Sequence, residues 1–372
     1  MDKQVRARII AFYLPQYHPI PENDKYWGKG FTEWTNVASA KPLFRGHYQP
    51  RIPADLGFYD LRLPEVQIAQ AELAKNAGIE GFMYWHYWFG NGRMLLEKPF
   101  ETVLKSGKPN FPFCLGWANH DWTTKTWEKG KALFRDKMIA KQEYLGEKDD
   151  ILHFNYCLQA FRDHRYVRIE DKPVFVIYSP AKFVEINRFI ALWNKLAIQN
   201  GLKGIYFIGL ASGRNSSYSK VMELGFDGVC NNNEYGAEVK VTGSLVKRRL
   251  MSLLGWETGT LLMKFDYGKI IEHLNTEENF KLNCYPIITP GLDRTPRAGK
   301  RAVVYHGATP EKFKKLVMNT CEYVDGKDFD HKIIFLKSWN EWGEGNYMEP
   351  DLKYGHGYLD ALRTVIIQDN KY

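Results

Sequence analysis

The chain has 372 residues, of which 44% are hydrophobic and 25% are charged, and this composition is typical of a folded globular protein. The formal net charge is +8, but no basic block alternates with aromatic residues, so we expect no nucleic-acid partner. No apolar run approaches the ~18 residues that a membrane-spanning helix needs.

Eight short apolar runs, rich in β-branched and aromatic residues, predict β-strands. In chain order they cover residues 8–14, 81–87, 111–117, 173–178, 204–210, 226–231, 282–289 and 332–339. Helical periodicity fills several gaps between them, at residues 64–77, 183–200, 310–324 and 358–367. Strands that alternate with helices are parallel, and eight such units favour a closed barrel over an open sheet.

The sequence therefore predicts an α/β fold, a single (β/α)8 TIM barrel over residues 1–372. From length alone, two domains of ordinary size are the competing interpretation. Two connections are long, at residues 15–60 after the first strand and 232–281 after the sixth. Both follow strand ends, where such a barrel carries its catalytic residues, so we expect both at the functional rim.

The predicted strand ends and the first long connection are rich in side chains that bind sugars, namely aromatic rings, amides, imidazoles and carboxylates. The candidates for substrate binding are Tyr13, Gln16, His18, Trp34, His86, Tyr87, Trp117, Asn119, His120, Asp121, Tyr178, Glu234, Asn340 and Trp342. Aromatic residues make up 15% of the chain, and they serve equally to fill a core or to stack on sugar rings. The sugar-stacking platform is expected among Trp27, Trp34, Trp85, Trp117 and Trp342.

The most specific feature is a pair of glutamates, Glu341 and Glu344, directly after the eighth predicted strand. Glycoside cleavage needs two carboxyl groups, one to protonate the leaving oxygen and one to assist attack at the anomeric carbon. Neighbouring tryptophans exclude water and can raise the pKa of one of them. The alternative interpretation is a solvated pair at the start of a helix.

We expect no metal and no other cofactor. His18, His86 and His120 follow separate strands, as in some metallohydrolase barrels, but none belongs to a local His-x-His or His-Glu-x-x-His pattern. The five cysteines are widely spaced and form no Cys-x-x-Cys pair. Reduced cysteines and the lack of a secretory pattern at the start predict a cytoplasmic protein.

Residues 247–254 combine cationic and apolar side chains. Two interpretations stay open, a cationic amphipathic helix that rests on a membrane and a plain surface helix.

The sequence resembles the WbsX-type family of polysaccharide (O-antigen) biosynthesis proteins, whose domain is similar to glycoside hydrolase family 99. The resemblance covers nearly the whole chain. It is carried by residues 12–19 (FYLPQYHP), 27–37 (WGKGFTEWTNV), 46–50 (GHYQP), 86–89 (HYWF) and 338–345 (SWNEWGEG).

The resemblance implies a (β/α)8 barrel and retaining endo-cleavage of α-mannosides. The glutamate that matches Glu341 would deprotonate the sugar 2-hydroxyl, which attacks the anomeric carbon to form an epoxide-like intermediate. The glutamate that matches Glu344 would act as general acid and then as base. The sequence departs from the family pattern at His120, where a glutamate is expected.

The leading hypothesis is a retaining glycoside hydrolase or transglycosidase that acts on a bacterial surface polysaccharide or its precursor. The alternatives are a glycosyltransferase of O-antigen or capsule biosynthesis and a non-catalytic glycan-binding assembly protein. The expected partners are an oligo- or polysaccharide substrate and, through peripheral association, membrane-bound polysaccharide assembly machinery.

Overall fold

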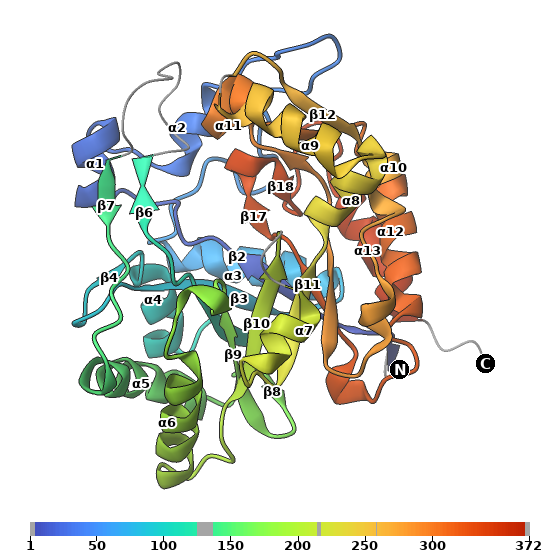
Figure 1. Ribbon diagram of the computed structural model, residues 1–372. Helices are drawn as coiled ribbons and strands as arrows, with labels where there is room; N and C mark the ends of the chain where they lie inside the picture. Colours follow the sequence, from blue (N-terminus) through green and yellow to red (C-terminus); the bar gives the residue numbers. More distant parts are fainter. Residues whose placement is uncertain (1–3, 125–136, 214–216, 258, 369–372) are drawn as a thin grey trace.

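The computed structural model describes residues 4–124, 137–213, 217–257 and 259–368, and eight parallel strands close into a barrel (Figure 1). The strands are β2 (Arg8–Tyr13), β3 (Ile79–Trp88), β5 (Phe113–Trp117), β9 (Lys172–Ile177), β10 (Tyr206–Ser212), β11 (Gly228–Asn232), β13 (Cys284–Ile288) and β16 (Ile333–Leu336). The barrel closes because the last strand, β16, pairs with the first, β2. The predicted (β/α)8 barrel is confirmed, and each of the eight predicted segments forms one of its strands.

The eighth strand is shorter than predicted and ends at Leu336. Beyond it the chain turns across the top of the barrel, where the amide of Trp339 donates to the carbonyl of Phe12 at 2.8 Å. The following residues form a small hairpin, β17 (Asn340–Glu341) with β18 (Asn346–Tyr347). The two predicted catalytic glutamates therefore belong to a turn that is pinned over the barrel mouth.

Helices cover the outside of the barrel. Those that the sequence predicts are α3 (Pro64–Asn76), α6 (Ile186–Gln199), α12 (Pro310–Glu322) and α13 (Gly357–Ile366). Three further helices, which the sequence patterns do not predict, are α4 (Lys98–Ser106), α5 (Glu147–Arg162) and α7 (Tyr218–Glu223). Near the two ends of the described chain, β1 (Gln4–Val5) pairs with β19 (Ile367–Gln368), and this strand pair lies at the end of the barrel opposite the hairpin (Figure 1).

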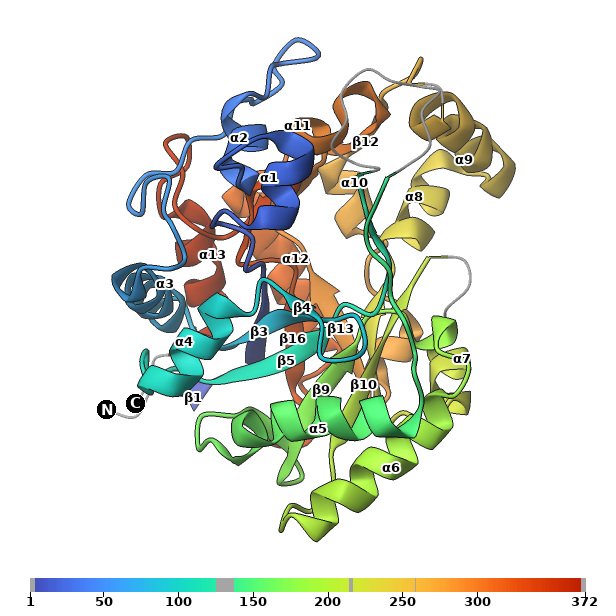
Figure 2. The same ribbon diagram turned by 90° about the vertical axis from the view of Figure 1, so that its left-hand side faces the viewer.

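The two long connections lie on the same rim, as predicted, and Figure 2 shows them on opposite sides of it. The first forms α1 (Pro21–Trp27) and α2 (Glu33–Ala38). The second forms α8 (Glu234–Thr242), α9 (Leu245–Ser252), β12 (Met263–Asp266) and α10 (Tyr267–Ile271). Among the described residues, no helix is long and apolar enough to cross a membrane.

Two further rim segments have structure that was not predicted. After β5, a hairpin pairs β6 (Trp122–Thr123) with β7 (Met138–Ala140). After β13, the chain forms β14 (Leu292–Asp293), α11 (Thr295–Ala298) and β15 (Val303–His306), and these two strands extend β12 into a small sheet. This second segment places arginines above the barrel mouth.

Close packing between neighbouring strands gives a direct test of the barrel. A Cβ on Gly81 of β3 would lie 2.6 Å from the carbonyl oxygen of Pro112, just before β5. Gly81→Ala should lower the free energy of unfolding by about 1–3 kcal/mol, because the two strands must separate. Gly326→Ala is the control, since its Cβ would meet no atom within 4 Å. Equal stability of the two variants in denaturant titrations would contradict this packing.

Candidate active site

A cavity of about 440 Å³ opens at the carboxyl ends of the barrel strands. Its wall includes many of the predicted residues, namely Gln16, Tyr87, His120, Asp121, Tyr178, Glu234, Glu341 and Glu344. The wall also contains residues that the sequence analysis did not single out, among them Trp122, Arg294, Arg297 and Lys337. The cavity is thus lined by carboxylates, cations and aromatic rings together.

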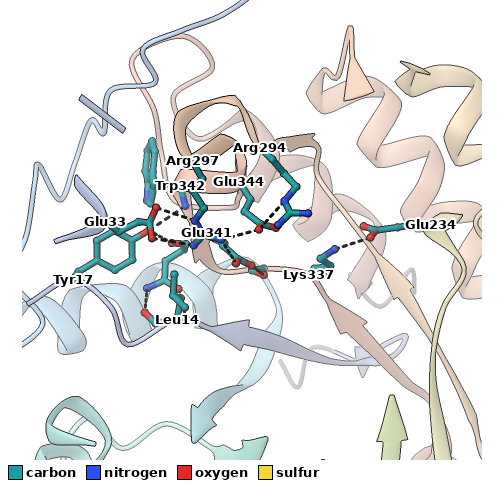
Figure 3. Close-up of polar contacts among 12 residues, drawn as sticks. Leu14, Tyr17, Glu33, Glu234, Arg294, Arg297, Lys337, Glu341, Trp342 and Glu344 are labelled. Atoms are coloured by element: carbon teal, nitrogen blue, oxygen red, sulfur yellow. Dashed lines mark hydrogen bonds and ion pairs between the residues drawn. The ribbon is translucent and has the colours of Figure 1, made fainter. Parts of the chain in front are cut away.

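The guanidinium of Arg297, on α11, joins three carboxylates (Figure 3). Its Nη1 donates to Glu341 at 3.1 Å and to Glu344 at 2.7 Å. Its Nε and Nη2 donate to the two carboxylate oxygens of Glu33, on α2, both at 3.0 Å. Because Glu341 and Glu344 share one donor nitrogen, their carboxylates are direct neighbours.

Further cations surround Glu344. The Nε of Arg294 lies 3.0 Å from its carboxylate. Lys337 is held at the same wall by Glu234, to which its Nζ donates at 2.7 Å. Burial alone would raise the pKa of Glu344, but Arg294, Arg297 and Lys337 together lower it to about 2.

Glu341 differs from its neighbour in its proton affinity. Burial raises its pKa, and the negative charge of Glu344 adds to the effect, against the opposing influence of Arg297. Its second oxygen accepts a hydrogen bond from the Ser338 hydroxyl at 3.1 Å. Of the two, Glu344 therefore holds its negative charge more firmly, and Glu341 is the first to take up a proton as the pH falls.

Local sequence explains the shape of the turn. Asn340 is fully buried and bonds both backbone groups of Leu14, accepting from its amide at 2.8 Å and donating to its carbonyl at 3.0 Å. A side chain on Gly343 would put its Cβ 1.8 Å from an oxygen of Glu33. Glycine at this position therefore lets Glu33 reach Arg297.

A further carboxyl, that of Glu349, packs against the turn and bonds Trp342. It is buried and accepts hydrogen bonds from Trp342 Nε1 at 2.6 Å, Gln70 Nε2 at 2.6 Å and the Tyr59 hydroxyl at 2.9 Å. Burial outweighs these donors and raises the pKa of Glu349 to about 7. Glu349 does not line the cavity, and its hydrogen bond to Trp342 helps to hold the turn that carries Glu341 and Glu344.

Several predicted binding residues do not line the cavity. They are Tyr13, His18, Trp34, His86, Trp117, Asn119, Asn340 and Trp342, and all are buried elsewhere. Side chains alternate along a strand, so neighbours at a strand end face opposite sides of the barrel wall. On β3, for example, Trp85 and Tyr87 line the cavity, whereas His86 points outward and bonds His153 of α5.

Three more of these residues, Tyr13, Trp117 and Asn119, have hydrogen-bond partners of their own. The hydroxyl of Tyr13 donates to Gln70 at 2.7 Å, and Trp117 Nε1 donates to the carbonyl of Trp88 at 3.0 Å. Asn119 donates to the Ser179 carbonyl and accepts from its amide, which ties β5 to the end of β9.

Most of the tryptophans expected to stack on sugar rings also lie away from the cavity. Trp34 donates to the carbonyl of Tyr59 at 2.8 Å inside the first connection, and Trp342 is fully buried. Of the five tryptophans expected there, Trp85 alone lines the cavity. Trp122 joins it from the hairpin after β5, where its ring stacks on Tyr87 with centroids 5.8 Å apart.

One described cluster has metal-ligand chemistry. His86, His153 and Cys157 are buried between β3 and α5, with ligand atoms within 4.8 Å of one another. The two Nε2 atoms lie 2.9 Å apart and share a hydrogen bond, and burial lowers the pKa of His86 to about 3. The cluster therefore has a full explanation as a neutral, hydrogen-bonded pair beside a buried thiol.

The pKa of Glu349 predicts a pH dependence of stability. In the unfolded chain a glutamate titrates near ~4.3, so between about pH 4.5 and pH 7 only the folded state keeps this proton. Stability should fall as the pH rises through that window, by up to about 3 kcal/mol from this group. Glu349→Gln should remove this part of the slope, measured as unfolding free energy against pH.

Glu65→Gln, an exposed change on α3, should leave the slope as it is in the wild type. An unchanged slope in Glu349→Gln would contradict the raised pKa.

Residues 9–362 match a family described as "Glycosyltransferase WbsX". Two curated proteins named WxcX, from Xanthomonas campestris pv. campestris strains B100 and ATCC 33913, are each 33% identical to the chain over 367 residues. The match covers 98% of this chain and 50% of each relative. The chain therefore spans about half the length of the curated relatives it matches.

Two solved structures are similar in fold. One is described as a glycoside hydrolase-like protein, with a TM-score of 0.61 and 15% identity, covering 99% of this chain and 96% of that chain. The other is the GH99 endo-α-mannosidase from Bacteroides thetaiotaomicron in complex with bis-tris-propane, with a TM-score of 0.57 and 15% identity. That match covers 97% of this chain and 96% of the mannosidase. At this identity the likeness shows the fold.

Proposed function

The chain belongs to the WbsX glycosyltransferase family, and we propose that it is a carbohydrate-active enzyme that breaks glycosidic bonds in the barrel-mouth cavity. The observation that carries the proposal is the neighbouring pair Glu341 and Glu344 in the cavity wall. Two carboxyl groups at short range, with pKa values pushed in opposite directions, are what acid–base cleavage of a glycoside requires.

We propose retaining chemistry, either hydrolysis or transfer to another sugar. In the proposed route the sugar 2-hydroxyl attacks the anomeric carbon first and water or an acceptor sugar attacks it second, and two successive inversions retain the configuration. The contact of both carboxylates with Arg297 Nη1 holds them close enough to act on one sugar. When ionised, Glu341 is the stronger base of the two because its proton affinity is raised, and it is proposed to take the proton from the sugar 2-hydroxyl, the role that the family resemblance implies.

Glu344 is proposed as the acid and then the base at the glycosidic oxygen. Its cationic partners keep it ionised in the free protein, which suits the second step, in which it accepts a proton. To donate a proton in the first step it must lose part of this charge stabilisation. We propose that bound substrate separates Arg294 from Glu344, since Arg294 is the less buried of its two arginine partners.

The proposed substrate is a bacterial surface polysaccharide or its precursor. A second cavity of about 260 Å³ continues from the first and shares Ser212, Asn232, Glu234, Arg294, Lys337 and Glu344 with it. A continuous polar groove of this kind suits a chain of several sugars better than a single one. It supports an oligo- or polysaccharide as substrate and endo-type cleavage as in the endo-α-mannosidase.

A glycosyltransferase that uses an activated sugar donor is the second candidate, because the family description favours it. The acidic stretch Asp328 to Asp330 resembles the pair that holds a donor's metal, but it lies at the opposite end of the barrel. There the carbonyl of Asp330 accepts from Arg8 at the start of β2. It does not contribute to either cavity.

The decisive experiment replaces each glutamate and varies the leaving group. Glu344→Gln should slow natural glycans with poor leaving groups by ~10²–10⁴-fold and spare activated aryl glycosides, because these need no acid. Glu341→Gln should slow all substrates alike, because it removes the base that creates the nucleophile. Product analysis by mass spectrometry on α-linked glycans and nucleotide sugars provides the readout.

Glu65→Gln is the matched control and should keep full activity. Near-normal turnover of both cavity variants on a confirmed substrate would reject the carboxylate mechanism. Turnover of nucleotide sugars that survives both changes would favour the transferase, and glycan binding without turnover in the wild type would favour a non-catalytic assembly protein.

The corrected stacking platform gives a second test. Trp85→Ala and Trp122→Ala should each weaken glycan binding by ~1–3 kcal/mol, if sugar stacking resembles that of a base on an aromatic ring. Trp34→Phe should leave the affinity unchanged, because its ring packs inside the first connection. Titration calorimetry with one oligosaccharide measures all three, and an affinity loss only in Trp34→Phe would restore the sequence-based expectation.

A further inference from the structure

The helix α9 turns an apolar stripe toward solvent. The stripe consists of Val246 and Leu250 of α9 and of Leu253 and Leu254 in the π-helical turn that continues it (Leu253–Glu257), and these residues are 74%, 55%, 48% and 42% exposed. Leu245 beside it is also exposed. Within the residues that the structure describes, no other segment of this length exposes as many large apolar side chains. A surface helix of a globular protein normally presents polar residues there.

Cationic residues border the stripe on both sides. With about 3.6 residues per turn, Arg249 falls along one edge of the stripe and Lys247 along the other, and both are exposed. The orientation of the helix is fixed from the opposite face by Arg248, which is buried. Arg248 Nε donates to Glu238 of α8 at 2.6 Å, and the Tyr305 hydroxyl donates to the same carboxylate at 3.0 Å.

The helix stands on the rim that carries the candidate active site. Arg248 and Ser252 of α9 line the second cavity together with Glu344, Arg294 and Lys337. Figure 2 shows α9 at the outer edge of this rim, beyond α8. The stripe is therefore held beside the mouth of the cavity.

We propose that α9 docks the protein peripherally on an anionic lipid bilayer. An apolar stripe with basic residues along its edges is the pattern of helices that lie in the membrane interface. The apolar side chains would enter the boundary of the acyl chains, while Lys247 and Arg249 would extend to the anionic headgroups. Charge complementarity at both edges of the stripe favours lipid over a protein partner.

Docking in this orientation has a consequence for the substrate. The face of α9 opposite the stripe lines the second cavity, so docking would hold this cavity near the membrane surface, within reach of a glycan attached to a membrane lipid. The docking itself does not depend on the chemistry proposed for Glu341 and Glu344, and it is measured without turnover.

The test is co-sedimentation of the full chain with vesicles of phosphatidylcholine, with and without phosphatidylglycerol. The wild type should sediment with the anionic vesicles and remain in solution with the neutral ones. Val246→Ser with Leu250→Ser should weaken the partition by about tenfold or more, since it removes the inserted side chains. Lys247→Glu with Arg249→Glu should weaken it at least as much, and high salt should do the same in the wild type.

Matched controls carry the same changes away from the rim. Ile198→Ser with Leu282→Ser removes two exposed apolar side chains just before β10 and β13, at the opposite end of the barrel, and Lys195→Glu with Lys315→Glu reverses two exposed charges on α6 and α12. Both should sediment as the wild type does, and thermal unfolding should show that all variants are folded. Failure of the wild type to bind anionic vesicles, or equal binding of α9 and control variants, would overturn the proposal.

Discussion

The contact of Arg297 with Glu33, Glu341 and Glu344 is the interaction on which the barrel mouth depends. Three buried carboxylates at such short range repel one another, and only a cation among them makes the arrangement stable. Removing one partner of a buried charge cluster typically costs ~3–5 kcal/mol, because the others stay buried without compensation. The guanidinium group suits this task because it is planar and its N–H donors point outward along different edges. It can therefore bind separate carboxylates at fixed angles.

That single contact also joins three distant parts of the chain. Glu33 comes from the first long connection, Arg297 from the segment after β13, and the glutamate pair from the turn after β16. The same cations that hold the turn together set the ionisation of Glu344. Structure and proton chemistry are therefore coupled, and a change in one is expected to change the other.

The two long connections form different parts of the rim. The connection after β2 supplies Glu33 and packs Trp34 beneath it, so it builds the rigid side of the site. The connection after β11 supplies the second cavity and carries α9, whose exposed stripe is anchored from behind by Arg248 and Glu238. The cavity thus lies between the tightly packed connection after β2 and the connection after β11, whose helix α9 exposes its apolar stripe to solvent.

The sequence by itself determined the barrel, the rim position of the long connections and the placement of Glu341 and Glu344 after the last strand. Short apolar runs and strand–helix alternation are local patterns, and local patterns are visible in a sequence. Only the tertiary structure decided which strand-end side chains face the cavity. His86 and Trp85 are neighbours in the chain, but the alternation of the strand and the register of the barrel send them to opposite sides. It also decided the partners of the glutamates, because Arg297 is 44 residues from Glu341 and 264 from Glu33, and no periodicity in a sequence encodes an ion pair between segments that meet only after folding.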